Sequence, residues 1–148
     1  MLLDPTQLLA CSCGKSSLET DIKRYDNIFV ARITAAKEVW VKGIGHVQGD
    51  FQLTETLKGS AKGIESLKTG IYDGDCGVPF RVGHYLLAFT GNTGHISLCS
   101  SSEELGVGFN DLYKHNEVYI ATLALLNPDH TNSYNKKSLS TATSGDKP

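Results

Sequence analysis

The stretch Cys11-Ser12-Cys13 carries two of the chain's four cysteines, with one residue between them. A disulfide within this pair would be strained, because bridged Cα atoms lie roughly 4.4–6.8 Å apart in a restricted geometry. The spacing therefore predicts that both cysteines pair with Cys76 and Cys99. Two pairings satisfy this condition, namely Cys11 with Cys76 and Cys13 with Cys99, or the crossed arrangement. Either pairing ties the beginning of the chain to two distant segments.

Free buried thiols and a metal site are the alternatives to disulfides. The sequence has no Cys-x-x-Cys knuckle, and no histidine lies close to Cys11 or Cys13, which weighs against a structural metal. Each bridge would close a long loop and stabilise the fold by ~4 kcal/mol in the chain-entropy treatment. Bridged cysteines also indicate an oxidising compartment, so we expect a secreted, extracellular or periplasmic protein.

Length and composition predict one ordinary globular domain. The chain has 148 residues, 40% hydrophobic residues and a net charge of −2, and no apolar run is long enough to span a membrane. The charge balance gives no reason to expect a nucleic-acid partner. The five histidines are scattered, and the sequence has no His-Glu-x-x-His, Gly-x-Ser-x-Gly or phosphate-loop motif. We therefore expect a protein that is not an enzyme, holds no cofactor and is monomeric.

The segment before Cys11 is similar to the end of an export signal. Leu8-Leu9-Ala10 places a small residue before the cysteine, as at a secretory cleavage site or a bacterial lipobox. The segment lacks a basic residue and its apolar character is interrupted at 4–7, so we interpret 1–10 as the remnant of a leader. Cys11 would then begin the mature chain, either free or as the lipid anchor of an outer-surface lipoprotein.

The hydrophobic pattern predicts a mainly β domain over 11–127 and a disordered polar tail over 128–148. A Ser16-x-x-Glu19 capping box predicts a short helix that ends near Tyr25. A second helix is expected between Asn110 and Pro128, packed on the β structure. Alternation and turn residues predict five strands, at 27–40, 46–57, 64–71, 85–90 and 95–99. Five strands joined by short turns predict a small closed barrel.

A series of motifs in this order resembles the netrin-like domain, and most of all the N-terminal domain of the tissue inhibitors of metalloproteinases. They are the Cys-x-Cys opening, Phe-Val-Ala-Arg-Ile at 29–33, Thr-Leu-Lys-Gly at 56–59, Asp-Cys-Gly at 75–77, Gly-His-Tyr-Leu-Leu-Ala-Phe at 83–89 and His-Ile-Ser-Leu-Cys at 95–99. The resemblance spans 11–126. It implies an OB-fold-type five-stranded barrel with flanking helices, and it favours the pairing of Cys11 with Cys76 and of Cys13 with Cys99.

The resemblance also implies a mechanism in which the chain binds a zinc metalloproteinase. The α-amine and carbonyl oxygen of Cys11 would chelate the zinc of the target protease, and Ser12 would enter its specificity pocket. An α-amine has a pKa of about 7.7–8.0, so its neutral form is accessible near neutral pH. Chelation requires that Cys11 be the free first residue. The inhibitory edge implied by the family comprises Cys11, Ser12, Cys13, Gly14, Lys15, Cys76, Gly77 and Val78.

Several departures from the family pattern leave a second function open. The chain has fewer cysteines than the family's inhibitory domain and lacks its cysteine-rich C-terminal domain. Gly14 and Lys15 replace residues that are usually more apolar, and the hairpin between the first two strands is expected to be short. These features fit a distant relative, such as a bacterial one. The alternative is a netrin-like interaction module, or surface lipoprotein, that binds a protein or glycan and uses its cysteines only for stability.

Overall fold

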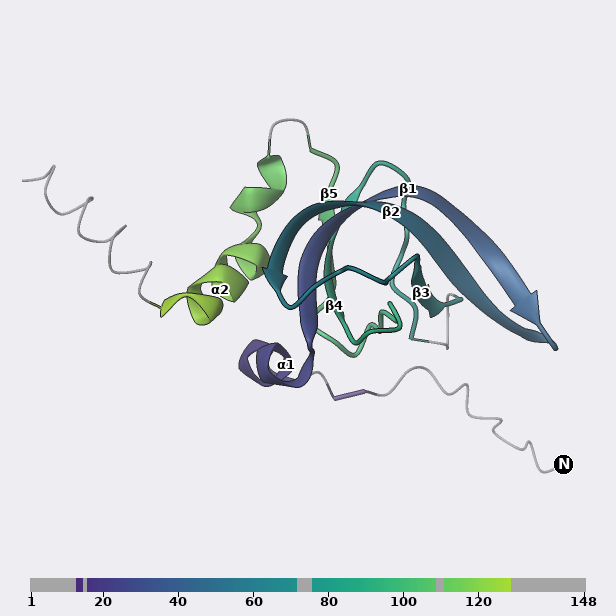
Figure 1. Ribbon diagram of the computed structural model, residues 1–148, viewed down its shortest axis with the longest axis horizontal. Coiled ribbons are helices and arrows are strands. Elements are labelled where there is room, and N and C mark those ends of the chain that lie inside the picture. Colours follow the sequence, from purple (N-terminus) through teal and green to yellow (C-terminus); the bar gives the residue numbers. More distant parts are fainter. Residues whose placement is uncertain (1–12, 15, 72–75, 109–110, 129–148) are drawn as a thin grey trace, which may run out of the picture.

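The computed structural model describes residues 13–14, 16–71, 76–108 and 111–128, and these form one antiparallel sheet with helices beside it (Figure 1). The predictions for the leader, for Cys11 and for 129–148 lie outside these ranges. The fold is mainly β. Within the described ranges the elements are α1 (Leu18–Arg24), β1 (Asn27–Val41), β2 (Ile44–Lys58), β3 (Leu67–Gly70), β4 (Tyr85–Thr90), β5 (Glu103–Gly106), the 3₁₀-helix η1 (Leu112–His115) and α2 (Glu117–Leu126).

The sheet has the strand order β3-β2-β1-β4-β5 and is built around the β1–β2 hairpin. Pairing in this hairpin continues to Val41 opposite Ile44, so the two long strands predicted at 27–40 and 46–57 form one hairpin. Lys42 and Gly43 form its turn, both with positive φ, and such turns match the right-handed twist of paired strands. Three register shifts between the strands bend the ribbon, and Figure 1 shows its tip projecting beyond the other strands.

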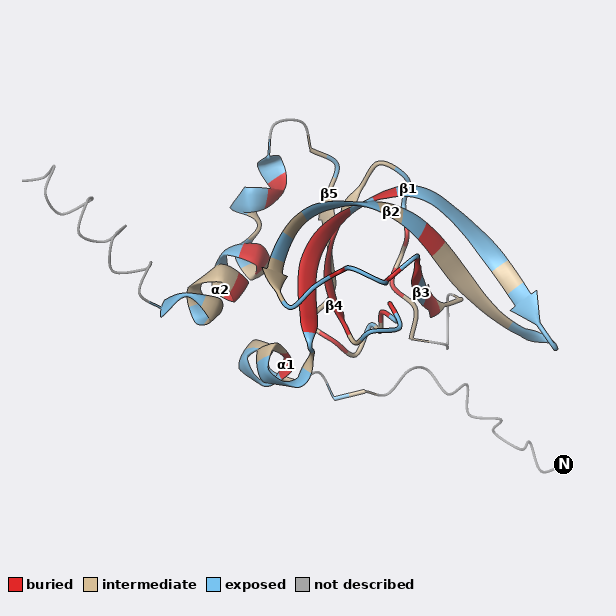
Figure 2. Cartoon of the chain, in the orientation of Figure 1, coloured by how far each residue is buried: buried red, intermediate tan, exposed pale blue. Residues whose placement is uncertain are grey.

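The sheet carries a hydrophobic cluster on each face. In β1, Phe29, Ala31 and Ile33 face the β3 side, whereas Ile28 and Val30 face the helices. This alternation follows from the two-residue period of a strand. Figure 2 shows that buried residues concentrate where β1 and β4 cross the centre of the molecule. In the part of the chain that the structure describes, no helix is long and apolar enough to cross a bilayer.

Helix α1 is fixed at both ends by side chains. Its N-cap is Ser17, whose hydroxyl accepts from the amide of Thr20, so the cap lies one residue after the predicted one. Lys58 Nζ donates to the carbonyl oxygens of Ile22, at 2.6 Å, and Tyr25, at 2.8 Å. These bonds satisfy carbonyl groups that a helix terminus leaves without partners.

Strand β5 differs from the sequence prediction. The residues at 95–99 form a single parallel bridge, Lys68 with His95, followed by a turn, and the fifth strand lies at 103–106, outside the five predicted strands. Serine side chains explain the difference, because the Ser100 hydroxyl donates to the Ser97 carbonyl at 2.6 Å. Such local bonds compete with a strand ladder. Strands β3 and β5 are the two edges of the sheet, so the predicted closed barrel is not confirmed.

The C-terminal helical region is also divided differently. Asn110, the predicted N-cap, lies outside the described residues. The long helix α2 instead begins after Asn116, whose side chain accepts from the amides of Val118 and Tyr119. It ends at Leu126, before Pro128, as the proline predicts.

Candidate functional site

A disulfide joins the N-terminal segment to the segment that follows β4. Cys13 and Cys99 are 86 residues apart in sequence, and their Cα atoms lie 5.5 Å from each other. The predicted pairing of these two cysteines is therefore confirmed, and the crossed pairing is excluded. Cys76 is also disulfide-bonded. Its predicted partner, Cys11, lies outside the described residues.

A backbone hydrogen bond brings the Cys76 segment beside the Cys99 segment. The amide of Leu98 donates to the carbonyl oxygen of Cys76 at 2.8 Å. Gly14 is exposed, and its Cα faces open space. We call these neighbouring residues the cysteine edge, which consists of Cys13, Gly14, Cys76, Gly77, Leu98 and Cys99.

Buried polar contacts fix the cysteine edge to β3. The Thr69 hydroxyl, which is almost fully buried, accepts from the amide of Val78 and donates to the carbonyl oxygen of Ile96, both at 2.8 Å. A Cβ atom on Gly77 would lie 2.0 Å from the carbonyl oxygen of Gly70. Any larger residue at position 77 would therefore force the two backbone segments apart. The Thr69 hydroxyl therefore links β3 to the segments at 77–78 and 96, and the absence of a side chain at Gly77 allows the close approach.

The structure brings together only part of the predicted inhibitory edge. Cys13, Gly14, Cys76 and Gly77 lie at the cysteine edge. Val78 is 5% exposed and packs in the β3-side core, so its side chain presents little surface to a partner. Cys11, Ser12 and Lys15 lie outside the described residues.

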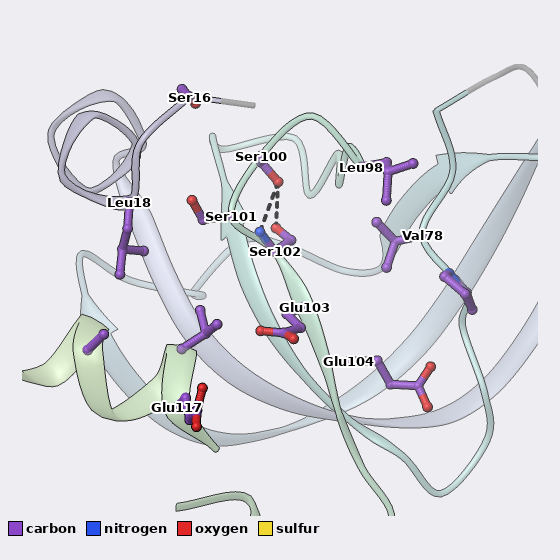
Figure 3. Close-up of a pocket in the computed structure, with 13 residues that line it drawn as sticks. Ser16, Leu18, Val78, Leu98, Ser100, Ser101, Ser102, Glu103, Glu104 and Glu117 are labelled. Atoms are coloured by element: carbon purple, nitrogen blue, oxygen red, sulfur yellow. Dashed lines mark hydrogen bonds between the residues drawn. The ribbon is translucent and has the colours of Figure 1, made fainter. Parts of the chain in front are cut away.

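A cavity of about 600 Å³ lies between the cysteine edge, β5 and α2 (Figure 3). We call it the acidic cavity. The cavity was not predicted, because the sequence pattern indicates neither a strand nor a site at 100–104. The consecutive run of three serines and two glutamates was its only signal in the sequence. Its lining residues are Ser16, Leu18, Val78, Pro79, Leu98, Ser100, Ser101, Ser102, Glu103, Glu104, Glu117, Val118 and Ala121.

The register of β5 separates its two glutamates. Glu104 pairs with Leu86, and Glu103 pairs with Leu87, whose side chain belongs to the helix-side cluster. Successive residues of a strand point to opposite faces. In Figure 3 the Glu103 carboxylate accordingly points from β5 toward α2, whereas Glu104 is directed away from that helix.

The carboxylates of the acidic cavity differ in their partners. Glu104 Oε1 contacts the His84 ring and forms an ion pair with Arg81 Nη1 at 3.3 Å. Glu103 Oε2 is buried and has no hydrogen-bond partner. Glu117 is exposed and lies in the first turn of α2, where the helix dipole favours negative charge. One carboxylate oxygen of Glu103 is therefore buried without a hydrogen-bond donor from the described chain.

The serines of the acidic cavity have structural roles. Ser101 donates from its amide and its hydroxyl to Asp21 Oδ2, both at 2.7 Å, and Asp21 is fully buried in α1. The Ser100 hydroxyl donates to the carbonyl of Ser97, and the Ser102 hydroxyl accepts from the amide of Phe89 at 2.9 Å. These bonds fix the loop before β5. Within the described ranges no three His, Cys, Asp or Glu side chains are grouped to hold a metal ion.

Two tyrosines on the helix side share one carboxylate. The hydroxyls of Tyr113 and Tyr119 donate to Glu55 Oε2, at 3.2 and 2.7 Å. Burial, reinforced by the negative charge of Glu55, raises the pKa of Tyr113 to about 12. Burial and the hydrogen bond to Glu55 raise the pKa of Tyr119 well above its usual range. This cluster connects η1 and α2 to β2 and lies apart from the cysteine edge.

No protein-family model matches the chain, and no curated protein matches it. Any assignment of function therefore depends on the geometry above and on the motifs in the sequence.

Proposed function

We propose that the protein is a secreted inhibitor of zinc metalloproteinases, similar to the tissue inhibitors, that acts through its N-terminus. The observation that carries this proposal is the cysteine edge. The Cys13–Cys99 disulfide and the hydrogen bond between Leu98 and Cys76 bring three segments to one place. A segment tied in this way loses little conformational entropy when it binds a partner.

The proposed chemistry requires a mature chain that begins at Cys11. Its neutral α-amine and its carbonyl oxygen would displace the water from a catalytic zinc and, with the three ligands of the protease, make the metal five-coordinate. Ser12 would enter the specificity pocket of the protease, and Gly14 and Gly77 would flank the contact. An added residue before Cys11 would convert the amine into an amide, which is a poor zinc ligand.

We also propose that the sheet is a variant of the OB-type barrel that the resemblance implies. The support is a set of bonds between β3 and the segment after β4. The Lys68 amide donates to the Gly94 carbonyl at 2.9 Å, and the Ile96 amide donates to the Lys68 carbonyl at 2.7 Å. The Thr90 hydroxyl donates to the His95 carbonyl at 3.0 Å. The segment at 94–96 thus lies between β3 and β4, where a closing strand of a barrel would lie.

The test of the inhibitor proposal compares two forms of the oxidised protein, one beginning at Cys11 and one retaining Ala10. We expect the first form to inhibit members of a zinc metalloproteinase panel. The form with Ala10 should inhibit at least ~100-fold less, because it lacks the amine ligand. Equal inhibition by both forms, or none by either across the panel, would contradict chelation by Cys11. The zinc-free proteases serve as the binding control.

One observation favours the second candidate, an interaction module. The tip of the β1–β2 hairpin exposes large apolar side chains, with Trp40 61% and Ile44 74% exposed. Exposed apolar groups close together often mark protein contacts. A module of this kind would bind its partner equally well with or without Ala10, and Trp40→Ser would weaken that binding. The inhibitor proposal predicts the opposite sensitivity to Ala10.

A further inference from the structure

The tip of the β1–β2 hairpin exposes apolar side chains on both faces of the sheet. Residues directly opposite each other in an antiparallel pair share a face, and successive residues of a strand alternate between the faces. Val41 pairs with Ile44 on one face, whereas Trp40 pairs with Gly45 on the other. Trp40, Val41 and Ile44 are all exposed, and Figure 2 shows the end of the hairpin as exposed surface. A partner that covers all three side chains must therefore surround the tip.

The side chains of Val41 and Ile44 are turned away from the β3-side core. The opposite face carries Val47, which packs against that core, and Gly49, where a Cβ atom would contact Phe80. We call the face of Val41 and Ile44 the outer face. Figure 1 shows α1 and α2 beside the other end of the hairpin, so the two helices do not cover the outer face near the tip.

A row of basic side chains crosses the outer face behind the apolar tip. Lys37 pairs with Gln48, which pairs in turn with Lys68. Lys68 also forms a parallel bridge with His95. These four residues therefore lie side by side on the outer face, where Lys37, Lys68 and His95 are exposed, and we call them the basic row. Glu38 lies on the opposite face, and the described residues of the outer face between the basic row and the tip include no acidic side chain.

We propose that the hairpin tip inserts into the surface of a bilayer that contains anionic lipids, with the basic row against the headgroups. A fluid bilayer contacts both faces of the tip at once, so Trp40, Val41 and Ile44 all leave water. Tryptophan is enriched at membrane–water interfaces. Each lysine near an anionic surface strengthens binding about fivefold. The proposal does not depend on inhibition of a protease, and it gives the tip a lipid partner in place of a protein.

The spacing of the tip and the basic row matches the layers of a bilayer surface. Strand residues rise about 3.3 Å each, so Lys37 lies about 13 Å from Val41 along β1. Interfacial segments bury their apolar groups roughly 5–10 Å deep, at the boundary between headgroups and acyl chains. Lysine stems span the remaining distance, because they lie along apolar surface while the ammonium group stays in water. The basic row therefore reaches the lipid phosphates when the tip is inserted.

Lys42 limits the depth of insertion. It forms the turn of the hairpin with Gly43, so its ammonium group must return to the headgroups along its own stem. A charge held in the hydrocarbon core is costly. The tip therefore stays at the interface and does not enter the centre of the bilayer.

The test uses Trp40, which is the only tryptophan of the chain. Its fluorescence is recorded while the full oxidised chain is titrated with vesicles of equal parts phosphatidylcholine and phosphatidylglycerol. We expect a saturable blue shift, binding at least ~10-fold weaker to pure phosphatidylcholine, and weaker binding at high salt. Acyl chains brominated near the headgroup should quench Trp40 more strongly than chains brominated near the methyl end.

Two double variants separate the apolar tip from the basic row. Val41→Ser/Ile44→Ser should weaken binding to the mixed vesicles at least ~10-fold, because these side chains no longer gain by leaving water. Lys37→Gln/Lys68→Gln should weaken binding to the mixed vesicles ~10-fold or more and leave binding to pure phosphatidylcholine unchanged.

Two variants outside the hairpin are the matched controls. Ile120→Ser removes an exposed apolar side chain from α2, and Lys62→Gln removes an exposed lysine from the loop before β3. Both should bind the mixed vesicles as the wild type does. All of the substitutions are at exposed positions, so the unfolding temperature without vesicles should stay close to that of the wild type.

Several outcomes would overturn the proposal. They are the absence of a blue shift or of quenching by the brominated lipids, and vesicle binding that survives Val41→Ser/Ile44→Ser. A blue shift that depends on protein concentration without vesicles would indicate a second copy at the tip. Binding of heparin without binding of vesicles would indicate a soluble polyanion on the basic row. Either of these two results would contradict a lipid partner.

Discussion

At Gly77 the chain passes so close to β3 that a single added carbon decides whether the cysteine edge can form. A Cβ atom there would lie 2.0 Å from the Gly70 carbonyl oxygen, and the obstacle is backbone that cannot rotate away. We expect Gly77→Ala to lower the free energy of unfolding by about 2 kcal/mol, within the range for overpacking a tight site. Urea unfolding of the oxidised protein measures this change.

Gly91→Ala is the control for Gly77→Ala. Gly91 follows β4, has no heavy atom within 4 Å of a built Cβ, and does not adopt a left-handed φ. At such a site alanine changes stability by less than ~1 kcal/mol, and it can stabilise by restricting the unfolded chain. Similar losses for both variants would mean that the close approach to Gly70 is not the cause.

At the level of elements, Glu55 connects β2 to both helical segments after β5 through Tyr113 and Tyr119. A raised tyrosine pKa stabilises the fold only while the phenol keeps its proton. In the unfolded chain tyrosine ionises near pH 10, whereas folded Tyr113 ionises near 12. This contribution is complete below pH 10 and decreases as the pH rises through 12.

We therefore expect the wild-type protein to lose stability between pH 10 and 12 more steeply than Tyr113→Phe. At pH 8 the variant should be less stable by about 1 kcal/mol, because Glu55 loses one donor and keeps Tyr119. The two stabilities should converge at alkaline pH. Urea unfolding at a series of pH values measures both curves, and parallel curves would contradict the raised pKa of Tyr113, to which burial contributes most and Glu55 next.

The elements that the sequence predicts are those whose pattern depends on burial alone. Strands β1 and β4 alternate or run continuously apolar because the core covers them, and both were placed to within one residue. Strand β5 was missed because it begins with Glu103-Glu104, and the carboxylates conceal a strand that pairs only at one edge. The Cys13–Cys99 pair followed from cysteine spacing and the resemblance. The acidic cavity could not be predicted, because it forms where a loop and two helices meet.

The whole molecule depends on the link between its N-terminal segment and the loop that precedes β5. The Cys13–Cys99 disulfide spans 86 residues, and closing a loop of this length stabilises the folded state by ~4.5 kcal/mol in the chain-entropy treatment. We expect Cys13→Ser/Cys99→Ser to lower the free energy of unfolding by about 2–4 kcal/mol, because measured disulfide contributions typically lie in this range and often fall below the chain-entropy figure.

Hydrogen exchange should locate the effect of the bridge. The Leu98 amide, which bonds to the Cys76 carbonyl, should lose protection before the amide of Val30 in the central strand β1. If instead both amides lost protection equally while the protein remained folded, the bridge would stabilise the molecule uniformly and the cysteine edge would not be a local unit. An unchanged free energy of unfolding would show that the sheet and its two hydrophobic clusters hold the N-terminal segment without the bridge.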